Sequence, residues 1–243
     1  RDVAPCWLSL VDDVQETAER HQVSCNVDIV RQCFSNFKAF FRTDSFVQIR
    51  LARLACAEKL GRVTQINFRS EIFADSNSCS GGDVKRVLSQ ALDDVDQWAL
   101  FEEDFQEERG RTYLREVSEK FQTCGVAADF DTNFGLAKLW HFGSHSLQEL
   151  SAMDSAPDAL RSLDAVLTKY GFHTVYCTGI DLRRHSANIY FRLHEGKVKS
   201  TCDVLEILAE LGLEQPSDQD ILTYITGPGT LAVTLRWDSR ECE

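Results

Sequence analysis

The chain has 243 residues, of which 43% are hydrophobic and 26% charged, as in an ordinary folded globular protein. Its formal net charge of −12 disfavours a nucleic-acid-binding or membrane-surface protein, because such proteins usually carry a basic excess. No apolar run is long enough to span a bilayer, and the nine cysteines form no CxxC pair, which is typical of reduced thiols. We therefore expect a cytoplasmic protein that binds neither nucleic acid nor membrane.

The first part of the chain predicts two helices followed by two strands. Apolar residues recur at helical spacing over 8–21 and 26–41. They alternate with polar residues over 45–54 and 64–73, which is typical of strands with one buried face. A Ser- and Gly-rich stretch, 74–83, then separates this block from the next.

The same kinds of element recur in the middle of the chain. A helix is predicted over 83–101, with Asp83 as its N-cap. A second helix is predicted over 111–125 and ends at Gly125, as helices often end at glycine. The pattern over 134–143 predicts a strand.

The last part of the chain repeats this order once more. Its predicted elements are helices over 146–153 and 157–171, a β-hairpin over 173–193, helices over 200–212 and 217–227, and a strand over 230–237.

Helix pairs that alternate with strand pairs predict an α+β fold of repeated ααββ units. Neighbouring strands joined by short turns must be antiparallel, so the helices are expected to cover one face of an antiparallel sheet. A sheet with enough strands can close into a barrel that encloses a lumen.

The segment DLRRHSANIYFRL, residues 181–193, places positive charge on a predicted strand. Period-two alternation separates an apolar face (Ala187, Ile189, Phe191, Leu193) from a polar one (Arg184, Ser186, Asn188, Tyr190, Arg192). Two interpretations stay open at this point. The polar face is solvated in an open sheet, or it lines a lumen where buried arginines require an anion.

Other predicted strands combine charged and aromatic residues on one face. Lys138 shares a face with Trp140 and Phe142, and Asn67 shares a face with Arg69. Such a combination suits a ligand that has an anionic head and an apolar tail.

The segments GLAKLWHFG (135–143) and DLRRHSANIYFR (181–192) resemble the soluble aromatic prenyltransferases of the ABBA type. Within that group they are most similar to the branch that prenylates 4-hydroxyphenylpyruvate, dihydroxynaphthalenes and dihydrophenazines. Supporting matches are QINFRS at 65–70 and AVTLRWDS at 232–239. The resemblance covers most of the chain.

The resemblance implies a PT-barrel, an antiparallel β-barrel of about ten strands with the helices outside. In that family further strands follow, the first of them beginning with a diphosphate-binding arginine. We therefore expect residues 1–243 to form a single PT-barrel domain that is incomplete at its C-terminal end.

The resemblance also implies roles for individual residues. Arg69, Lys138 and Arg184 would bind the diphosphate and stabilise its charge, and Asn188 would donate a hydrogen bond to it. No acid–base residue is implied. The pocket for the prenyl group and the aromatic acceptor would be lined by Trp140, Tyr176, Tyr190 and Thr230.

The family includes magnesium-dependent and metal-independent members, and Asn67 stands where the former carry a metal-binding aspartate. An amide is a poor sole ligand for magnesium, so we expect no metal requirement and no cofactor.

The activity that the resemblance implies is transfer of a dimethylallyl or geranyl group from its diphosphate to an electron-rich aromatic carbon of a phenolic or similar acceptor. The reaction would pass through an allylic cation that aromatic rings stabilise, as in enzymes of secondary metabolism. Two alternatives stay open. One is a non-catalytic relative that binds a prenyl diphosphate or another anion, and the other is an interaction protein whose open sheet edges pair with a partner or with a second copy of itself.

Overall fold

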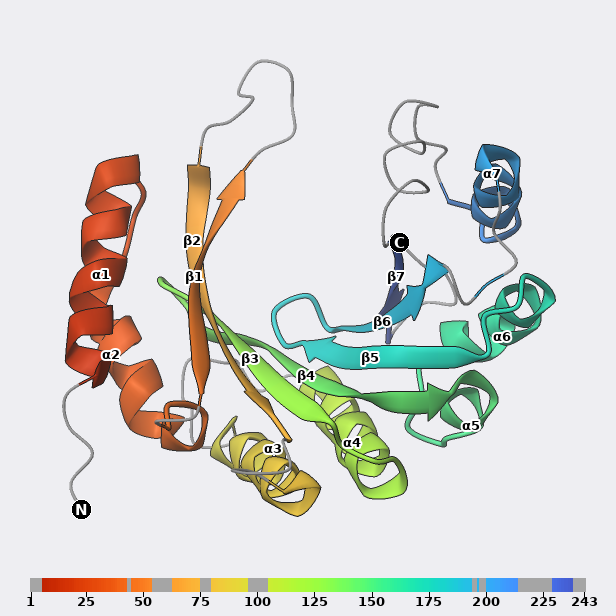
Figure 1. The fold of residues 1–243 in the computed structure, drawn as a ribbon, viewed down its shortest axis with the longest axis horizontal. Helices are drawn as coiled ribbons and strands as arrows, with labels where there is room; N and C mark the ends of the chain where they lie inside the picture. Colours follow the sequence, from red (N-terminus) through yellow and green to blue (C-terminus); the bar gives the residue numbers. More distant parts are fainter. Residues whose placement is uncertain are drawn as a thin grey trace. The chain divides into compact units, whose positions relative to one another are not determined.

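The structure, a computed structural model, describes residues 6–42, 45–53, 63–74, 80–95, 105–193, 196, 200–213 and 229–237. Pairs of helices precede pairs of strands from α1 to β6, as the sequence predicts, and in the described residues after β6 one helix, α7, precedes one strand, β7 (Figure 1). The chain divides into two compact units, one of Arg1–Glu102 with Gly125–Leu139 and the other of Glu103–Cys124 with Trp140–Glu243. Each unit is described by itself below.

The first unit contains helices and strands of the first repeat and part of the second. Its elements are α1 (Cys6–His21), α2 (Val27–Asn36), the 3-10 helix η1 (Lys38–Phe40), β1 (Phe46–Arg53), β2 (Val63–Phe73), α3 (Gly81–Val95), β3 (Gly125–Asp131) and the first residues of β4 (Gly135–Ser146). The helix α2 begins where Asn26 accepts hydrogen bonds from the backbone N–H groups of Asp28 and Ile29.

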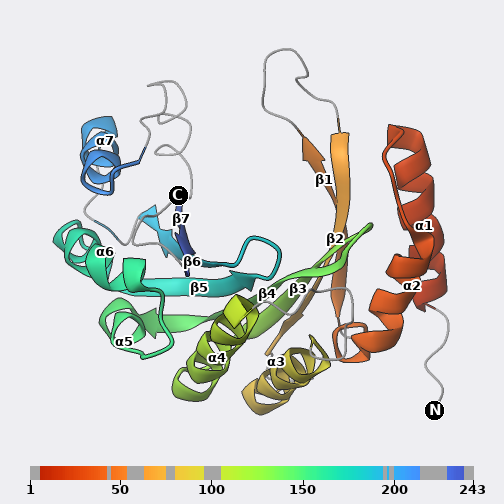
Figure 2. The same ribbon diagram turned by 180° about the vertical axis from the view of Figure 1, so that it is seen from behind.

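Strand β2 is the central strand of this unit and pairs antiparallel with β1 and β3. Its side chains alternate between a buried apolar face and a polar face. On the apolar face Phe68 stacks on Phe130 of β3 with ring centroids 5.0 Å apart, and Phe34 of α2 lies 5.4 Å from Phe68. The view from behind shows α1 and α2 running beside β1 and β2 (Figure 2). This packing buries one face of the sheet and leaves the other for polar residues.

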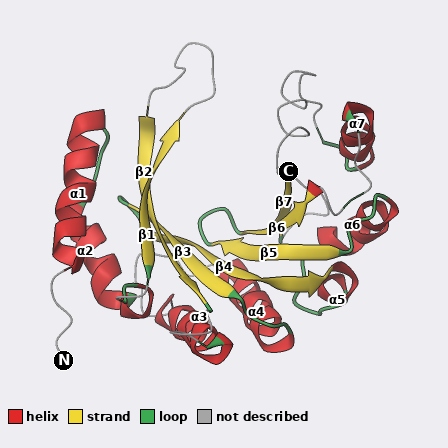
Figure 3. Cartoon of the chain, viewed as in Figure 1, coloured by secondary structure: helices red, strands yellow, loops and turns green. Residues whose placement is uncertain are grey.

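The second unit contains the remaining helices and strands. Its elements are α4 (Phe105–Lys120), the rest of β4, α5 (Leu147–Ser151), α6 (Asp158–Lys169), β5 (Thr174–Asp181), β6 (Ser186–Arg192), α7 (Thr201–Glu210) and β7 (Thr230–Arg236) (Figure 3).

Strand β6 is central in the second unit, paired antiparallel with β5 and β7. Its apolar face is fully buried, because Ala187, Ile189 and Phe191 are each 0% exposed. Helix α4 packs against β5, where the buried hydroxyl of Tyr113 hydrogen-bonds Thr178 at 3.0 Å. The predicted separation of β6 into an apolar and a polar face is therefore confirmed from Ser186 onward.

The seven strands are hydrogen-bonded in chain order, from β1 to β7. Together with the ααββ order of the elements, this confirms the predicted α+β class and the antiparallel sheet. The single PT-barrel domain over residues 1–243 stays a prediction. Within the described ranges no helix is long and apolar enough to cross a membrane.

Three local predictions were wrong, and one strand was missed. Gly125 was predicted to end a helix, but α4 ends at Lys120 and Gly125 begins β3, the strand that was not predicted. Asp83 is not the N-cap of α3. Ser80 takes that position, since its hydroxyl accepts from the Asp83 backbone N–H while the Asp83 carboxylate accepts from Ser80 N–H in return.

The third error concerns residues 182–185, which were predicted to be part of a strand. Asp181 ends β5, and β6 begins only at Ser186. The Asp181 carboxylate accepts hydrogen bonds from the backbone N–H groups of Arg183 and Arg184, at 3.1 and 3.0 Å, so the chain turns here. The predicted helix over 217–227 and the end of the helix predicted over 83–101 lie outside the described residues.

Candidate functional site

The polar face of β6 carries two buried polar groups that have no partner in the described part of the chain. Asn188 is 7% exposed, and its Nδ2 forms no hydrogen bond there. The hydroxyl of Ser186, a residue 1% exposed and two positions earlier, is also unpaired. A buried polar group without a partner costs about 1–3 kcal/mol, so such groups are rare unless a ligand or water satisfies them.

The other end of the Asn188 amide is satisfied. Its Oδ1 accepts a hydrogen bond of 3.0 Å from the Thr234 hydroxyl of β7. The free group is therefore the N–H donor, which suits a ligand that accepts hydrogen bonds, such as an oxyanion.

Next to Asn188 on the same face of β6 is a cluster of aromatic rings. The ring of Tyr190 lies 5.5 Å from Trp140 of β4 and 6.2 Å from Tyr176 of β5, both in edge-to-face geometry. The Tyr176 hydroxyl is 3.4 Å from the hydroxyl of Thr230 on β7. The structure thus brings together the four residues that were predicted to line the pocket, although their role there stays a prediction.

Arg192 belongs to this cluster as well, and sequence analysis gave it no role beyond its place on the polar face. Its guanidinium carbon lies 5.2 Å from the centre of the Tyr176 ring, a cation–π geometry. The spacing of residues on β6 was the signal that could have identified it, because Arg192 has the same parity as Asn188 and Tyr190.

Arg184 lies in the turn before β6 and is exposed. It is therefore not part of the strand face that the alternation predicted, but it precedes the buried Ser186 by only two residues. Its predicted contact with a diphosphate stays untested.

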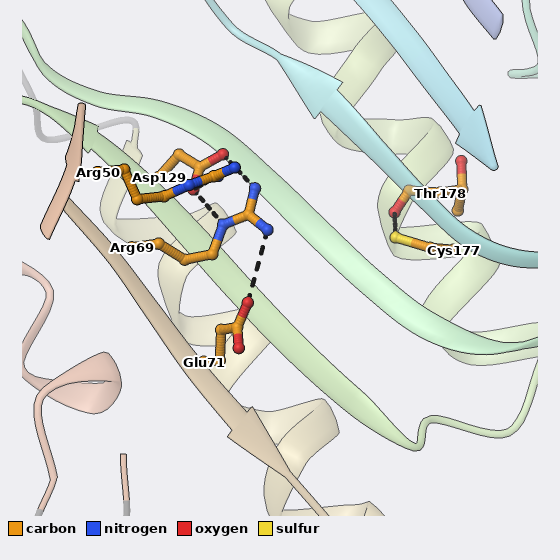
Figure 4. Close-up of polar contacts among 6 residues, drawn as sticks. All are labelled: Arg50, Arg69, Glu71, Asp129, Cys177 and Thr178. Carbon is orange, nitrogen blue, oxygen red and sulfur yellow. Dashed lines mark hydrogen bonds and ion pairs between the residues drawn. The ribbon is translucent and has the colours of Figure 1, made fainter. Parts of the chain in front are cut away.

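In the first unit Arg69 is held by two carboxylates (Figure 4). Its Nε and Nη2 donate to the two carboxylate oxygens of Asp129 at 2.5 and 2.7 Å, and its Nη1 lies 3.5 Å from Glu71. Arg50 of β1 approaches the same Asp129 at 3.6 Å. The side chains of Arg69 and Asp129 are only 17% and 11% exposed.

These contacts change the electrostatics of Arg69. Burial alone would lower its pKa, but hydrogen bonds and charge from Asp129 and then Glu71 more than offset burial and raise the pKa. The guanidinium is charged and already paired. Asp129 was not identified from the sequence because it lies on the unpredicted strand β3.

The remaining predicted residues also lie on strands. Asn67 is half-buried on β2, opposite Arg50 of β1 and Asp131 of β3, and its Oδ1 is buried without a partner in the described ranges. Lys138 is half-buried on β4. The described residues contain no group of three or more His, Cys, Asp or Glu side chains placed to hold a metal ion. The expected metal independence is not tested by this.

A surface pocket of about 450 Å³ lies elsewhere in the second unit, beside α5 and α6. It is lined by Gln148, Arg161, Thr168 and their neighbours, and by none of the predicted site residues. The polar face of β6 is therefore the stronger candidate, because it combines unpaired buried donors with aromatic rings.

Comparison with known proteins agrees with the resemblance seen in the sequence. The 5,10-dihydrophenazine-1-carboxylate 9-dimethylallyltransferase of Streptomyces anulatus is 30% identical over 135 residues, 54% of this chain and 45% of that protein. An aromatic prenyltransferase of Talaromyces marneffei is 36% identical over 102 residues, 41% of this chain and 27% of that protein. One of Sclerotinia sclerotiorum is 26% identical over 123 residues, 48% and 39% of the two chains.

The matches thus span less than half the length of each of these relatives. The family defined as aromatic prenyltransferase Orf2 matches residues 85–243, which include β3 to β7 and the whole aromatic cluster but neither Asn67 nor Arg69. Since this match covers well over half of the chain, the chain belongs to the aromatic prenyltransferase Orf2 family.

Proposed function

We propose that this chain transfers a prenyl group from a prenyl diphosphate to an aromatic carbon. The observation that carries the proposal is the polar face of β6, where the unpaired donor of Asn188 and the hydroxyl of Ser186 lie beside Tyr190 and its neighbouring rings. A prenyl diphosphate has matching parts, an oxyanion head that accepts hydrogen bonds and an apolar allylic tail.

The diphosphate head would accept hydrogen bonds from Asn188 and Ser186. Arg184, in the turn that leads into β6, supplies a positive charge close to these donors along the chain. Assignment of Lys138 and Arg69 to the same anion rests on the family resemblance alone. Arg69 is expected to contribute least, because Asp129 already neutralises it.

The aromatic cluster would act on the other half of the donor. Cleavage of the allylic C–O bond leaves the electron pair on the diphosphate and positive charge on the allyl group. The faces of Tyr176, Tyr190 and Trp140 can stabilise that charge, and their bulk excludes water that would quench it. The electron-rich acceptor carbon then forms the new C–C bond, and the acceptor ring loses a proton.

We further propose dimethylallyl diphosphate as donor, since the Streptomyces anulatus relative is named as a dimethylallyltransferase, and an aromatic acceptor of the phenolic or phenazine type. Catalysis without magnesium is proposed because Asn67 offers an amide in place of a carboxylate, and because Asp129 is engaged by Arg69.

The test is incubation of the purified chain with dimethylallyl diphosphate and a panel of phenols and reduced phenazine carboxylates, with EDTA or with magnesium. We expect a singly prenylated product by mass spectrometry in both conditions. Asn188→Ala should weaken donor affinity roughly tenfold, the value of one hydrogen bond to a charged group. Product only with magnesium would contradict metal independence, and saturable donor binding without product would favour the non-catalytic alternative.

A further inference from the structure

Thr234 and Asn188 are direct neighbours across the β6–β7 ladder. They are paired in the antiparallel register, and the Thr234 hydroxyl donates to Asn188 Oδ1 at 3.0 Å. Both side chains lie on the polar face of the sheet, the face that also carries Tyr190.

This contact decides which end of the amide is available. An asparagine side chain has an acceptor oxygen and a donor nitrogen of nearly equal size, and a rotation of about 180° about its last bond exchanges them. While Thr234 donates to Oδ1, the nitrogen occupies the other position, where it is buried and unpaired among the described residues.

The main chain of Asn188 is held separately. Its carbonyl oxygen accepts from the Thr178 hydroxyl at 3.2 Å. Because the single hydroxyl proton of Thr178 is used there, the Tyr113 hydroxyl of α4 must donate to Thr178 Oγ1, 3.0 Å away. Burial raises the pKa of Tyr113 to about 12, so this hydroxyl keeps its proton. With the backbone fixed, the side-chain orientation is the remaining freedom.

We propose that Thr234 is a positioning residue that presents the Asn188 N–H to the diphosphate of the donor. The inference rests on the proposed function. A diphosphate oxygen only accepts hydrogen bonds, so the opposite amide orientation would set a carbonyl oxygen against an anion. With the Thr234 hydroxyl donating to Oδ1, as in this structure, the amide is held in the binding-competent orientation before the ligand arrives, whereas a flipped amide would need that hydroxyl to rotate and accept from Nδ2.

The experiment measures affinity of the chain for inorganic pyrophosphate and for dimethylallyl diphosphate by isothermal titration calorimetry. Thr234→Val keeps the shape of the side chain and removes the hydroxyl. It should weaken both ligands about fivefold, because the competent amide orientation is then only fractionally populated. Thr234→Ser restores the donor and should restore the affinity. Thr64→Val, at an exposed threonine of β2, is the matched control and should change nothing.

A double-mutant cycle separates positioning from a general structural effect. In an Asn188→Ala background there is no amide to orient, so Thr234→Val should cost no further affinity. An equal loss in both backgrounds, or no loss with Thr234→Val in the parent chain, overturns the inference. The proposed function fails in a different way: Asn188→Ala then leaves pyrophosphate affinity unchanged, or the parent chain binds neither ligand, which overturns both.

Discussion

At the scale of single residues, a buried histidine pair has hydrogen bonds that run in one direction. His145 Nδ1 lies 2.8 Å from the carbonyl oxygen of Val175 and must donate to it. His145 Nε2 is then an acceptor and takes the proton of His141 Nδ1 at 2.7 Å. His141 Nε2 in turn accepts from the Thr123 hydroxyl at 2.8 Å. Both rings are 0% exposed and neutral in this arrangement.

This pair makes stability depend on pH. Burial lowers the pKa of His145 from 6.5 to about 4, with the Val175 hydrogen bond opposing the shift. The unfolded chain therefore takes up the proton first as pH falls, so the contribution is complete above about pH 6.5 and is lost progressively toward pH 4. We expect a loss of about 3 kcal/mol over this window in urea unfolding measurements.

His145→Gln is the comparison for this prediction. It removes the titrating group and should flatten the pH dependence by most of that amount, while the other ionisable residues remain. A variant with the same slope as the parent chain would show that His145 is not responsible.

The ion pair of Arg69 and Asp129 is a second residue-scale feature. Asp129→Asn should destabilise the first unit by about 2 kcal/mol, less than a fully buried pair because some solvent reaches it. Asp28→Asn breaks the exposed pair with Arg31, in which the carboxylate is 81% exposed, and should change stability by less than about 0.5 kcal/mol. Denaturant midpoints of the two variants test this, and equal effects would contradict it.

At the scale of elements, strand β4 runs very close to the segment that leads into β3. The N–H of Cys124 donates to the carbonyl of Phe142 at 2.8 Å. A Cβ atom at Gly143 would collide with the backbone carbonyl of Gln122, which cannot move as a flexible side chain could. Gly143→Ala should therefore lower stability by about 2 kcal/mol or more, as overpacking does.

Gly82 in α3 is the matched control for that substitution. A Cβ at this position meets only Ser80 Oγ at an ordinary 3.7 Å, and alanine favours helix over glycine. Gly82→Ala should leave the melting temperature unchanged or slightly higher. If Gly143→Ala behaved in the same way, the tight contact at Gln122 would be refuted.

The elements show why some of the fold could be predicted from sequence and some could not. Strand β2 has one buried face, so alternation identified it. Strand β3 is buried on both faces, and its sequence GVAADFD alternates between apolar and polar residues only over its last four positions, which is too short a signal to identify a strand. The hairpin was predicted correctly, but the Asp181 turn depends on a side-chain hydrogen bond that competes with the ladder.

Some features of the candidate site could likewise be predicted from the sequence, and others could not. Trp140 and Tyr190 could be identified from strand parity together with family resemblance, and Tyr176 and Thr230 from the resemblance alone. The four residues lie together. The pairing of Arg69 with Asp129 joins residues 60 positions apart, and depends on a strand that the sequence did not reveal.

At the scale of the whole molecule, the repeat of helix and strand pairs separates core packing and candidate ligand binding onto opposite faces of the strands. The apolar faces carry helices in each unit, and the polar faces carry the candidate ligand groups. A net charge of −12 over the chain is compatible with an anion site, since the donors of Asn188 and Ser186 are local and buried. The net charge of the chain therefore does not exclude an anion site, whereas the alternation of side chains along β6 indicates where such a site would lie.

The register of β6 and β7 restricts how this chain can change length during evolution. Insertion of one residue inside β7 would turn Val233 or Leu235 toward Asn188 in place of Thr234, because neighbouring side chains point to opposite faces. Helix α7 (Thr201–Glu210), which lies between the two strands in the chain, is not part of this ladder. Insertions and deletions among relatives should therefore be more frequent near α7 than within β7, and the spacing from Thr230 to Thr234 should stay constant.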